Sequence, residues 1–179
     1  KHLGLVRQKI LARHWWPDGS TLDLFDDYET SQEAIYDFAG LKGFKEFQNF
    51  FQKTKLLFET FDLPIMQTGE PSQWDMAKLL MQQPSLARYI APLHTMASKL
   101  AQYFSDPRLA QLFGRYATYV GGSPYVSPAL LCLIWQAEAK GVWCVKGGMH
   151  QLAQTLMSLA KERQAEFEFK TKVKRILVN

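Results

Sequence analysis

The chain has 179 residues, 47% of them apolar, and its 21 Lys and Arg against 17 Asp and Glu give a formal net charge of +4. This length suits one domain, or one domain with part of another. The longest unbroken apolar run, from Ala129 to Trp135, is far shorter than the roughly 20 residues that span a bilayer as a helix. We expect no nucleic-acid partner, because the sequence has no dense basic helix or known binding motif. The mild positive charge indicates either an ordinary solvated surface or attraction to an anionic membrane.

A β-hairpin is predicted at the start of the chain, with strands at residues 3–16 and 20–25. The turn between them is Pro17-Asp18-Gly19, in which proline fixes φ and glycine accepts a positive φ. In the second strand, Leu22 and Leu24 alternate with Asp23. This alternation is typical of a strand with one buried face.

Helices are predicted from Thr30 onward. Thr30 and Glu33 match a capping box, in which each side chain satisfies a free backbone N–H of the first turn. Gly40 separates the first helix from the second. The predicted helices cover about 30–38, 42–60, 73–82 and 85–104, the last interrupted at Pro92. The second helix is expected to bury an apolar face made of Phe44, Phe47, Phe51, Leu57 and Phe58.

Two later helices have sharper start signals. Asp106-Pro107 and Ser127-Pro128 each place a capping side chain before a proline at the first helical position. The first helix is expected to run to about Val120, where Gly121-Gly122 ends it. The second is expected to run to about Ala139 and to end at Gly141. The buried face of the first is predicted to contain Leu109, Leu112, Phe113 and Tyr116.

The last forty residues alternate between strand and helix. We predict a strand at Val142–Val145, a tight turn at Gly147-Gly148, and an amphipathic helix to about Arg163. Strands are then predicted at Phe167–Phe169 and Val173–Val178. This α/β pattern differs from the helical middle, so we place a boundary near Gly141 and expect an α+β fold.

Several kinds of chemistry are excluded by the sequence. The four histidines are scattered and form no metal-ligand set, so no metal site is expected. No nucleophile elbow or P-loop is present. The two cysteines, Cys132 and Cys144, stand in apolar surroundings and are expected to be small core residues in a reducing compartment. Asp26, Asp27 and Glu29 are expected to interact favourably with a helix N-terminus.

Four segments, in order and with their spacing, carry a family resemblance. They are the hairpin Trp16–Leu24, the S-P-x-x-x-P-A element Ser123–Ala129, the G-x-W-x-x-x-G-G-M turn Gly141–Met149, and the V-x-x-I strand Val173–Ile176. Together they resemble the carotenoid (phytoene) desaturase family of flavoproteins. Among its members, the chain most resembles the desaturases that act on hydroxylated or methoxylated acyclic carotenoids.

The resemblance implies a mainly helical substrate-binding domain over residues 1–140, with the hairpin at 3–25 and helices over 30–139. It implies a partial, Rossmann-like FAD-binding domain over residues 141–179. The G-x-G-x-x-G motif and the C-terminal flavin segment of the family are absent from the sequence. We therefore expect a central fragment that is inactive and colourless alone, with FAD bound only by the full-length protein. The parent is expected to be cytoplasmic and peripherally membrane-associated, with a lipophilic carotenoid substrate.

The resemblance also implies site residues, each of which has an ordinary structural explanation as well. The backbone of Val173 would meet the adenine part of FAD, and the turn with Gly147, Gly148 and Met149 would lie near the flavin. The substrate-binding tunnel would be lined by Tyr119, Gly121, Gly122, Pro124, Tyr125, Trp135 and Trp143.

Arg115 and Glu138 are charges within apolar segments. Because a buried charge needs a partner, we expect them either to pair structurally or to include a group that assists proton loss. No catalytic residue is assigned beyond these two candidates.

Two other functions remain open from the sequence. One is another flavin oxidoreductase, such as an amine oxidase, in which further segments would supply an aromatic cage. The other is a non-enzymatic helical module that docks on membranes or partners, slightly favoured by the alternating Lys170, Lys172 and Lys174. Such a module would show an exposed apolar patch with a basic rim.

Overall fold

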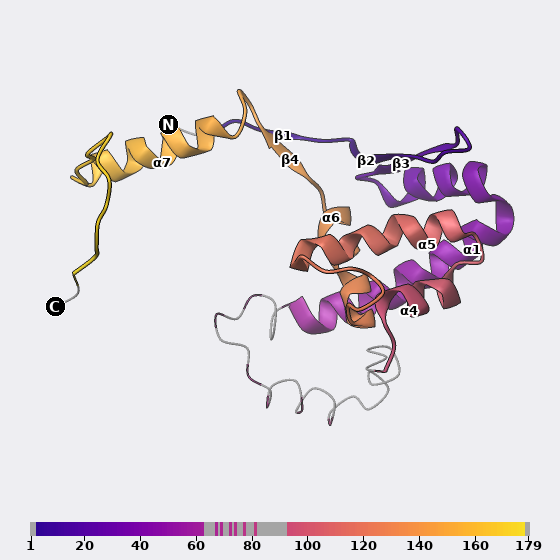
Figure 1. Cartoon of the computed structure of the whole chain (residues 1–179). Coiled ribbons are helices and arrows are strands. Elements are labelled where there is room, and N and C mark those ends of the chain that lie inside the picture. The colour runs from indigo at the N-terminus through magenta and orange to yellow at the C-terminus, as the bar shows by residue number, and fades with distance from the viewer. Residues whose placement is uncertain are drawn as a thin grey trace. The chain divides into compact units, whose positions relative to one another are not determined.

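The computed structural model describes residues 3–62 and 93–177 (Figure 1). It also describes six isolated positions, Gln67, Gly69, Ser72, Trp74, Ala77 and Met81. The chain forms two compact units, one of Gln8–Val142 and one that joins Lys1–Arg7 to Trp143–Asn179. Most of the predicted helix at 73–82, and the stretch 85–92 with Pro92, lie outside the described residues.

The predicted hairpin is confirmed over β2 (Ile10–Trp15) and β3 (Thr21–Phe25), which pair antiparallel. Gly19 has a φ of 82°, and its N–H donates to the Trp16 carbonyl at 3.0 Å. Leu22 and Leu24 are buried, as their alternation predicts. The strand does not begin at residue 3, however. Residues 5–7 form a separate strand, β1, which pairs with a segment near residue 145 rather than with β3.

The long helix α1 (Tyr28–Phe61) has the predicted break at Gly40, whose φ of 68° and ψ of −172° interrupt the helical backbone. The start of the helix differs from the prediction. Asp27 is the N-cap, and its carboxylate accepts hydrogen bonds from the backbone N–H of Thr30 at 2.8 Å and from its hydroxyl at 2.5 Å. Asp27 therefore acts at a helix N-terminus, as expected of the acidic cluster, whereas Thr30 lies inside the first turn.

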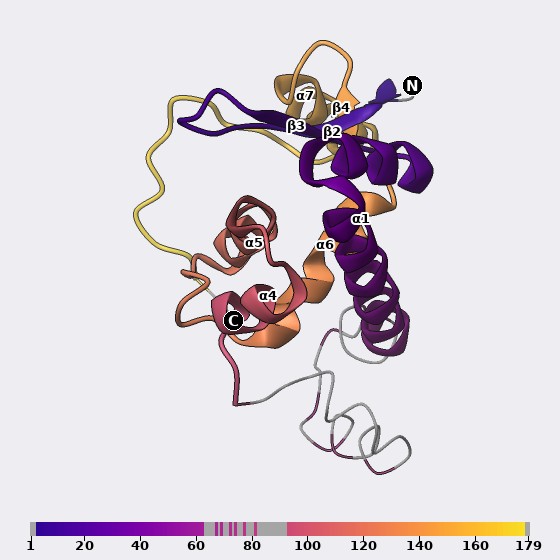
Figure 2. The ribbon, with the colours of Figure 1, turned by 90° about the vertical axis from the view of Figure 1, so that its right-hand side faces the viewer.

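Helices α4 (Met96–Tyr103) and α6 (Ile134–Ala139) lie beside α1, and α5 (Pro107–Gly114) lies against α4 (Figure 2). The cap at Asp106 is confirmed, because its carboxylate accepts from the Arg108 N–H at 2.8 Å. Helix α5 continues as the 3-10 segment η2 (Arg115–Val120). The cap predicted at Ser127 is wrong: the next helix opens as the 3-10 segment η3 (Ala129–Leu133), with Pro128 at the cap and no capping side chain.

Aromatic side chains fill the core of the larger unit. Phe113 of α5 lies 4.6 Å from Phe50, 5.2 Å from Phe104 and 5.4 Å from Trp135, measured between ring centroids. Phe47 of α1 lies 5.7 Å from Trp135. Burying one such side chain fully contributes roughly 1.5–3 kcal/mol, so these contacts hold α1, α5 and α6 together. All four residues predicted for the buried face at 109–116 are buried.

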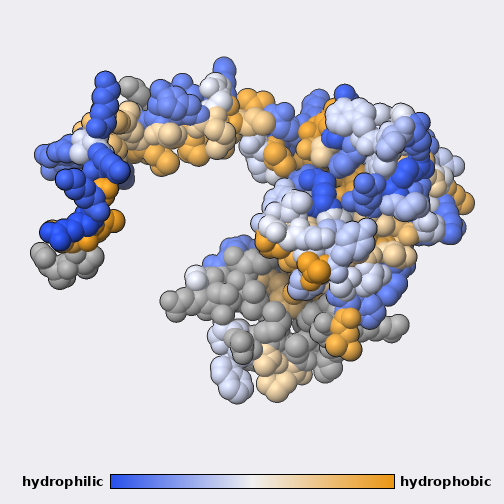
Figure 3. Space-filling model, in the orientation of Figure 1, coloured by the Kyte–Doolittle hydropathy of each residue, from blue (hydrophilic) through white to orange (hydrophobic). Residues whose placement is uncertain are grey.

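The smaller unit is built on β1 (Leu5–Arg7) and β4 (Trp143–Val145), which pair antiparallel with Leu5 opposite Val145. A turn at Gly147 and Gly148 follows, with φ values of 85° and 88°. Helix α7 (His150–Glu162) then forms as predicted, but none of its residues is buried. Figure 3 shows apolar atoms along one side of this helix. Its amphipathic pattern is therefore real, and its apolar side is uncovered among the described residues.

Two predicted strands are absent from the described residues of the C-terminal segment. Phe167 and Phe169 stack at 6.2 Å but lie in irregular backbone, and residues 171–177 have no regular structure. A strand needs a neighbour to satisfy its backbone N–H and C=O groups, and the described residues provide none for either segment. The mixture of helices and small sheets fits an α+β fold, but these residues form no Rossmann-like unit.

Candidate functional site

An apolar groove of about 760 Å³ lies between α4, α5, η2 and the loop that follows η2. Its volume falls within the range usual for small-molecule sites. Its apolar walls include Leu100, Phe104, Pro107, Ala110, Pro124 and Tyr125. Pro124, Tyr125 and Arg115 are the predicted site residues that line it. This arrangement can hold an apolar ligand.

The predicted glycine pair positions one wall of this groove. Gly121 has a φ of 66°, which favours glycine, and a Cβ on Gly122 would lie 2.5 Å from the Ser127 hydroxyl oxygen, so that hydroxyl would have to move. The chain then returns toward α4, where the Pro124 carbonyl accepts from the Ala97 N–H at 2.8 Å. The two glycines thus act through the backbone by placing Pro124 and Tyr125.

Arg115 and Glu138 form an ion pair, with Arg115 Nη2 2.5 Å from Glu138 Oε1. The Glu138 side chain is 7% exposed and that of Arg115 is 29% exposed. Arg115 Nη2 also donates to the Tyr116 hydroxyl at 2.8 Å, and the Tyr119 hydroxyl donates to Glu138 Oε2 at 3.0 Å. The expected pairing is therefore present, and both carboxylate oxygens of Glu138 are engaged.

Burial controls the protonation of the groups around this pair. It raises the pKa of Tyr116 and of Tyr119, which keeps both phenols protonated. Burial alone would lower the pKa of Arg115, but Tyr116 and Glu138 outweigh it and raise that pKa. Burial also lowers the pKa of His14 on β2, and the Arg115 charge lowers it further. At neutral pH the cluster therefore has one compensated ion pair and no unengaged carboxylate.

Two buried N–H groups have no hydrogen-bond partner among the described residues, Arg115 Nε and Trp135 Nε1. Trp135 is 1% exposed and packs against Phe47, Phe51 and Phe113. It borders a second cavity of about 260 Å³ rather than the groove. Of the two unpaired donors, only Arg115 belongs to a residue that lines the groove.

Sequence reasoning missed His14 and most of the α4 and α5 groove residues. His14 pairs with Leu22 across β2 and β3, so the strand register would have placed it on the buried face. On α5 and η2 the missed residues Pro107, Gln111, Gly114 and Thr118 recur every three or four positions. That spacing marks a second helix face beside the buried one.

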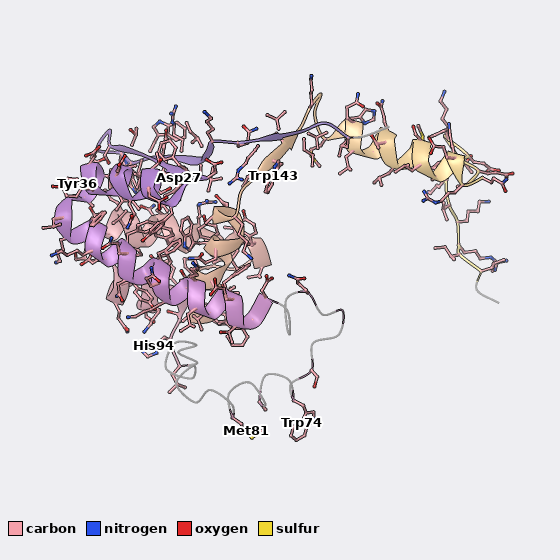
Figure 4. The ribbon with its side chains drawn as sticks, turned by 180° about the vertical axis from the view of Figure 1, so that it is seen from behind. Asp27, Tyr36, Trp74, Met81, His94 and Trp143 are labelled. Atoms are coloured by element: carbon pink, nitrogen blue, oxygen red, sulfur yellow. The ribbon has the colours of Figure 1, made fainter. Side chains whose placement is uncertain are left out.

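The residues proposed for the cofactor lie in the smaller unit. The Gly148 N–H donates to the Val145 carbonyl at 2.9 Å, so it serves the turn itself, and a Cβ on Gly148 would meet nothing within 4 Å. Met149 and Val173 are exposed. Trp143, on β4 (Figure 4), has the Arg7 guanidinium 5.5 Å from its ring centroid. The turn thus uses the Gly148 N–H itself, and the flavin contacts of these residues stay a prediction.

Neither a metal cluster nor a membrane-crossing helix is found in the described part of the chain. No three His, Cys, Asp or Glu side chains there are placed to hold a metal ion. No helix among the same residues is long and apolar enough to cross a bilayer. Both cysteines are free thiols; Cys132 is buried, which raises its pKa to about 12, and Cys144 is exposed.

Sequence comparison identifies relatives along nearly the whole chain. It is 47% identical over 177 residues to the hydroxyneurosporene desaturase of Rhodobacter capsulatus. The alignment covers 99% of this chain and 36% of that protein. It is 45% identical over 176 residues to the same-named protein of Cereibacter sphaeroides, with 98% and 36% covered. The chain is homologous to the carotenoid desaturases. The resemblance carried by the four sequence segments is thereby confirmed.

More distant desaturase homologues match over the same extent. The 1-hydroxycarotenoid 3,4-desaturase of a Flavobacterium species is 30% identical over 178 residues, with 96% of this chain and 35% of that protein covered. The chain thus spans about a third of the length of its desaturase relatives. No protein-family model matches it.

Proposed function

We propose that this chain is the substrate-binding part of an FAD-dependent carotenoid desaturase, which removes two hydrogens from an acyclic, hydroxylated or methoxylated carotenoid. The observation that carries the proposal is the apolar groove of about 760 Å³ in a chain homologous to these enzymes. Apolar surface removed from water contributes roughly 25 cal/mol per Å². A long polyene gains from such burial and, being stiff, loses little conformational entropy on binding.

The residues implied by the resemblance keep proposed roles within this function. In the groove, Pro124 and Tyr125 would contact the polyene directly, and Gly121 and Gly122 would hold them in place. Tyr119 would act through its hydrogen bond to Glu138. Trp135 and Trp143 line no part of the groove, so we assign them packing roles in their own units.

The redox step needs an acceptor for two electrons, and FAD bound to the full-length protein would supply it by accepting a hydride. We propose that residues 141–179 form part of the flavin-binding domain and that residues 1–140 form the substrate domain. Val173, Gly147, Gly148 and Met149 would be among the flavin contacts.

We also propose that the parent is cytoplasmic and associates with the membrane peripherally, because its substrate is lipophilic. Four exposed apolar side chains on η2 and the following loop support this assignment. They are Tyr119, Val120, Tyr125 and Val126. Tyr125 also lines the groove, so a lipid surface that contacted this loop would lie at the groove wall. The mildly basic charge of the chain agrees with an anionic surface.

The two alternatives are less well supported. An amine oxidase is not favoured, because the relatives at 45–47% identity are named hydroxyneurosporene desaturases. A non-enzymatic docking module does not account for relatives named as carotenoid desaturases at 45–47% identity.

The test is to express the full-length parent protein in cells that make acyclic carotenoids. We expect the pigment absorption to move to longer wavelength, because each new double bond extends the conjugated system. Ala101→Trp should reduce this shift by filling the groove, since Ala101 lines it while remaining exposed.

The matched control is Gln102→Trp, an exposed position on the same helix that does not line the groove, and it should leave the shift unchanged. No change of pigment with the unmodified protein would contradict the proposed activity. Equal loss of activity in both variants would contradict the assignment of the groove.

A further inference from the structure

We propose that the groove binds an oxygenated polyene in one orientation, with the oxygen-bearing end at Ser105 and Gln111 and the hydrocarbon toward Tyr125. Gln111 is then a specificity-determining residue, because its side-chain amide donates a hydrogen bond to the ligand oxygen. This inference rests on the proposed function and deepens it by naming the end of the groove that receives the oxygen.

The groove has two distinct ends, because α4 forms one side and α5 with η2 forms the other. At the start of α4, the Ala97 N–H donates to the Pro124 carbonyl, which lies beyond η2, at 2.8 Å. Just after α4, Phe104 stacks on Phe113 of α5 with ring centroids 5.2 Å apart. The eight residues of α4 rise roughly 12 Å between these points. One end of the groove therefore lies at the loop after η2, and the other lies where α4 joins α5.

The end where α4 joins α5 is polar and open. Ser105 and Gln111 both line the groove there, and both are exposed, so a ligand in the groove can reach them. The Ser105 hydroxyl donates to Glu46 at 3.1 Å, so its oxygen remains an acceptor. Gln111 Oε1 accepts from Trp16 Nε1 at 3.0 Å. An indole N–H can only donate, which identifies the amide atom that faces it as the oxygen.

Gln111 Nε2 is the donor that remains at this end. It bonds to no other group in the part of the chain that the structure describes. The bond from Trp16 holds the amide by its oxygen, so the Nε2 donor has a restricted position before a ligand arrives. A donor that is already positioned loses little side-chain freedom on binding, and more of the hydrogen-bond energy appears as affinity.

The loop end of the groove suits hydrocarbon instead. Its lining there includes Pro124 and Tyr125. Arg115 and Thr118 stand nearer this end, and both engage protein groups: Arg115 pairs with Glu138, and the Thr118 hydroxyl donates to the Arg115 carbonyl at 2.7 Å. An apolar ligand segment therefore fits this end, while an oxygen is better satisfied at the other.

The polar groups also select the kind of oxygen. An alcohol can accept from Gln111 Nε2 and donate to Ser105 Oγ, whereas an ether can only accept. A carboxylate would lie close to Glu46, which holds Ser105, and would be repelled. A plain hydrocarbon would displace water from Gln111 without replacing its hydrogen bond. The chemistry fits an alcohol or a methyl ether at one end of a polyene.

The decisive variant is Gln111→Glu, which keeps an oxygen for Trp16 but replaces the Nε2 donor with a second oxygen. The probes are neurosporene, hydroxyneurosporene and the methyl ether of hydroxyneurosporene, presented to the chain in detergent micelles. Binding is measured as pigment retained by immobilised protein. We expect the unmodified chain to bind both oxygenated polyenes roughly fivefold more tightly than neurosporene, as one net hydrogen bond implies.

Gln111→Glu should abolish the preference for the methyl ether, because neither partner can then donate. It should retain the preference for hydroxyneurosporene, whose O–H can donate to the new carboxylate. A general disturbance of the groove would change both oxygenated polyenes alike, so this divergence is specific to the lost donor.

Gln102→Glu is the matched control. Gln102 is exposed on α4 and also has an engaged carbonyl oxygen, which accepts from Lys99 Nζ at 3.3 Å, but it does not line the groove. This variant makes the same change of charge and should retain both preferences. Ala101→Trp, which fills the groove, should weaken the binding of all three polyenes.

The outcomes separate this inference from the proposed function. If the unmodified chain binds the methyl ether no better than neurosporene, or if Gln111→Glu keeps that preference, the role of Gln111 is overturned and the groove remains a polyene site. If no polyene binds, or if Ala101→Trp binds all three as tightly as before, both proposals fail.

Discussion

The two units follow the same sequence rules but reach different degrees of burial. In the larger unit, the apolar faces of α1 and α5 meet, and Phe50 and Phe113 are 0% exposed. In the smaller unit, α7 has an equally regular apolar face, yet Leu156 is 58% exposed and no residue of the helix is buried. Amphipathic spacing therefore predicts that a helix forms and which side is apolar, but it does not predict what covers that side.

The strands show the same limit of prediction, because two segments with the same alternation differ in structure. Leu22 and Leu24 alternate with polar residues, and so do Phe167 and Phe169. Only the first pair lies in a strand, because β2 supplies the neighbouring backbone. Alternation fixes which way side chains face, whereas hydrogen bonding to a neighbour decides whether a strand exists.

The largest expected effect comes from the centre of the aromatic core. Phe113→Ala should lower the free energy of unfolding by about 3–5 kcal/mol, because it removes ring contacts to Phe50, Phe104 and Trp135 and leaves a cavity. Urea denaturation followed by far-ultraviolet circular dichroism measures the change.

Leu156→Ala is the counterpart in the smaller unit, and it should change stability by no more than about 0.5 kcal/mol. A loss comparable to that of Phe113→Ala would show that α7 is buried in solution, and the contrast between the units would disappear.

The next effect concerns the ion pair beside the groove. Glu138→Gln should cost about 2 kcal/mol, since it leaves the Arg115 charge without its carboxylate. This is less than the roughly 3–5 kcal/mol of a fully buried pair, because Arg115 keeps partial contact with water. Thermal or urea unfolding would reveal the loss, and an unchanged midpoint would mean that the pair contributes nothing.

Removing the cap of α1 should have a smaller effect. Asp27→Ala is expected to destabilise the chain by about 1 kcal/mol, because two hydrogen bonds from Thr30 are lost. Asp27→Ser provides the control, since serine also caps helices well and should retain most of the stability. If the two variants behave alike, the capping role is wrong.

The smallest effect is a pH dependence centred on His14, whose pKa is lowered by burial and then by Arg115 and is opposed by Leu22, Glu138 and Asp23. A folded-state pKa below the unfolded value of about 6.5 means that the unfolded chain takes up the proton first. Stability should therefore fall as the pH drops through 6.5 toward the folded-state pKa.

Urea unfolding between pH 7.5 and 5 tests this behaviour. His14→Asn should flatten the curve in that window. The aspartates with lowered pKa values, Asp18, Asp23, Asp27 and Asp106, titrate below it and leave the slope there unaffected. An identical slope in the variant would show that His14 does not titrate differently on folding.

Local chemistry explains what could be predicted from the sequence. The turn at Gly19, the break at Gly40 and the cap at Asp106 depend on a few neighbouring residues. The pairing of Leu5 with Val145 spans the length of the chain, and no local pattern specifies it. The sequence does not fix the start of α1, because Asp27 and Thr30 are both good capping residues and only the folded geometry distinguishes them.

The candidate site also has one part that the sequence predicts and another that depends on the three-dimensional fold. Arg115 and Glu138 are recognisable in the sequence as charges within apolar segments, and they do pair. The groove itself required three-dimensional information, because α4, α5 and the loop at Pro124 each contribute one wall. The approach of His14 to that pair depends on how β2 is placed beside η2, which periodicity does not encode.

The two thiols differ in exposure, so they should react with alkylating reagents at different rates. Cys132 is buried, with its pKa raised to about 12, whereas Cys144 is exposed. Alkylating reagents attack the thiolate, so native protein should incorporate one label quickly at Cys144. Cys132 should be labelled only when the aromatic core opens. The rate of this second labelling step therefore reports how often the larger unit opens locally.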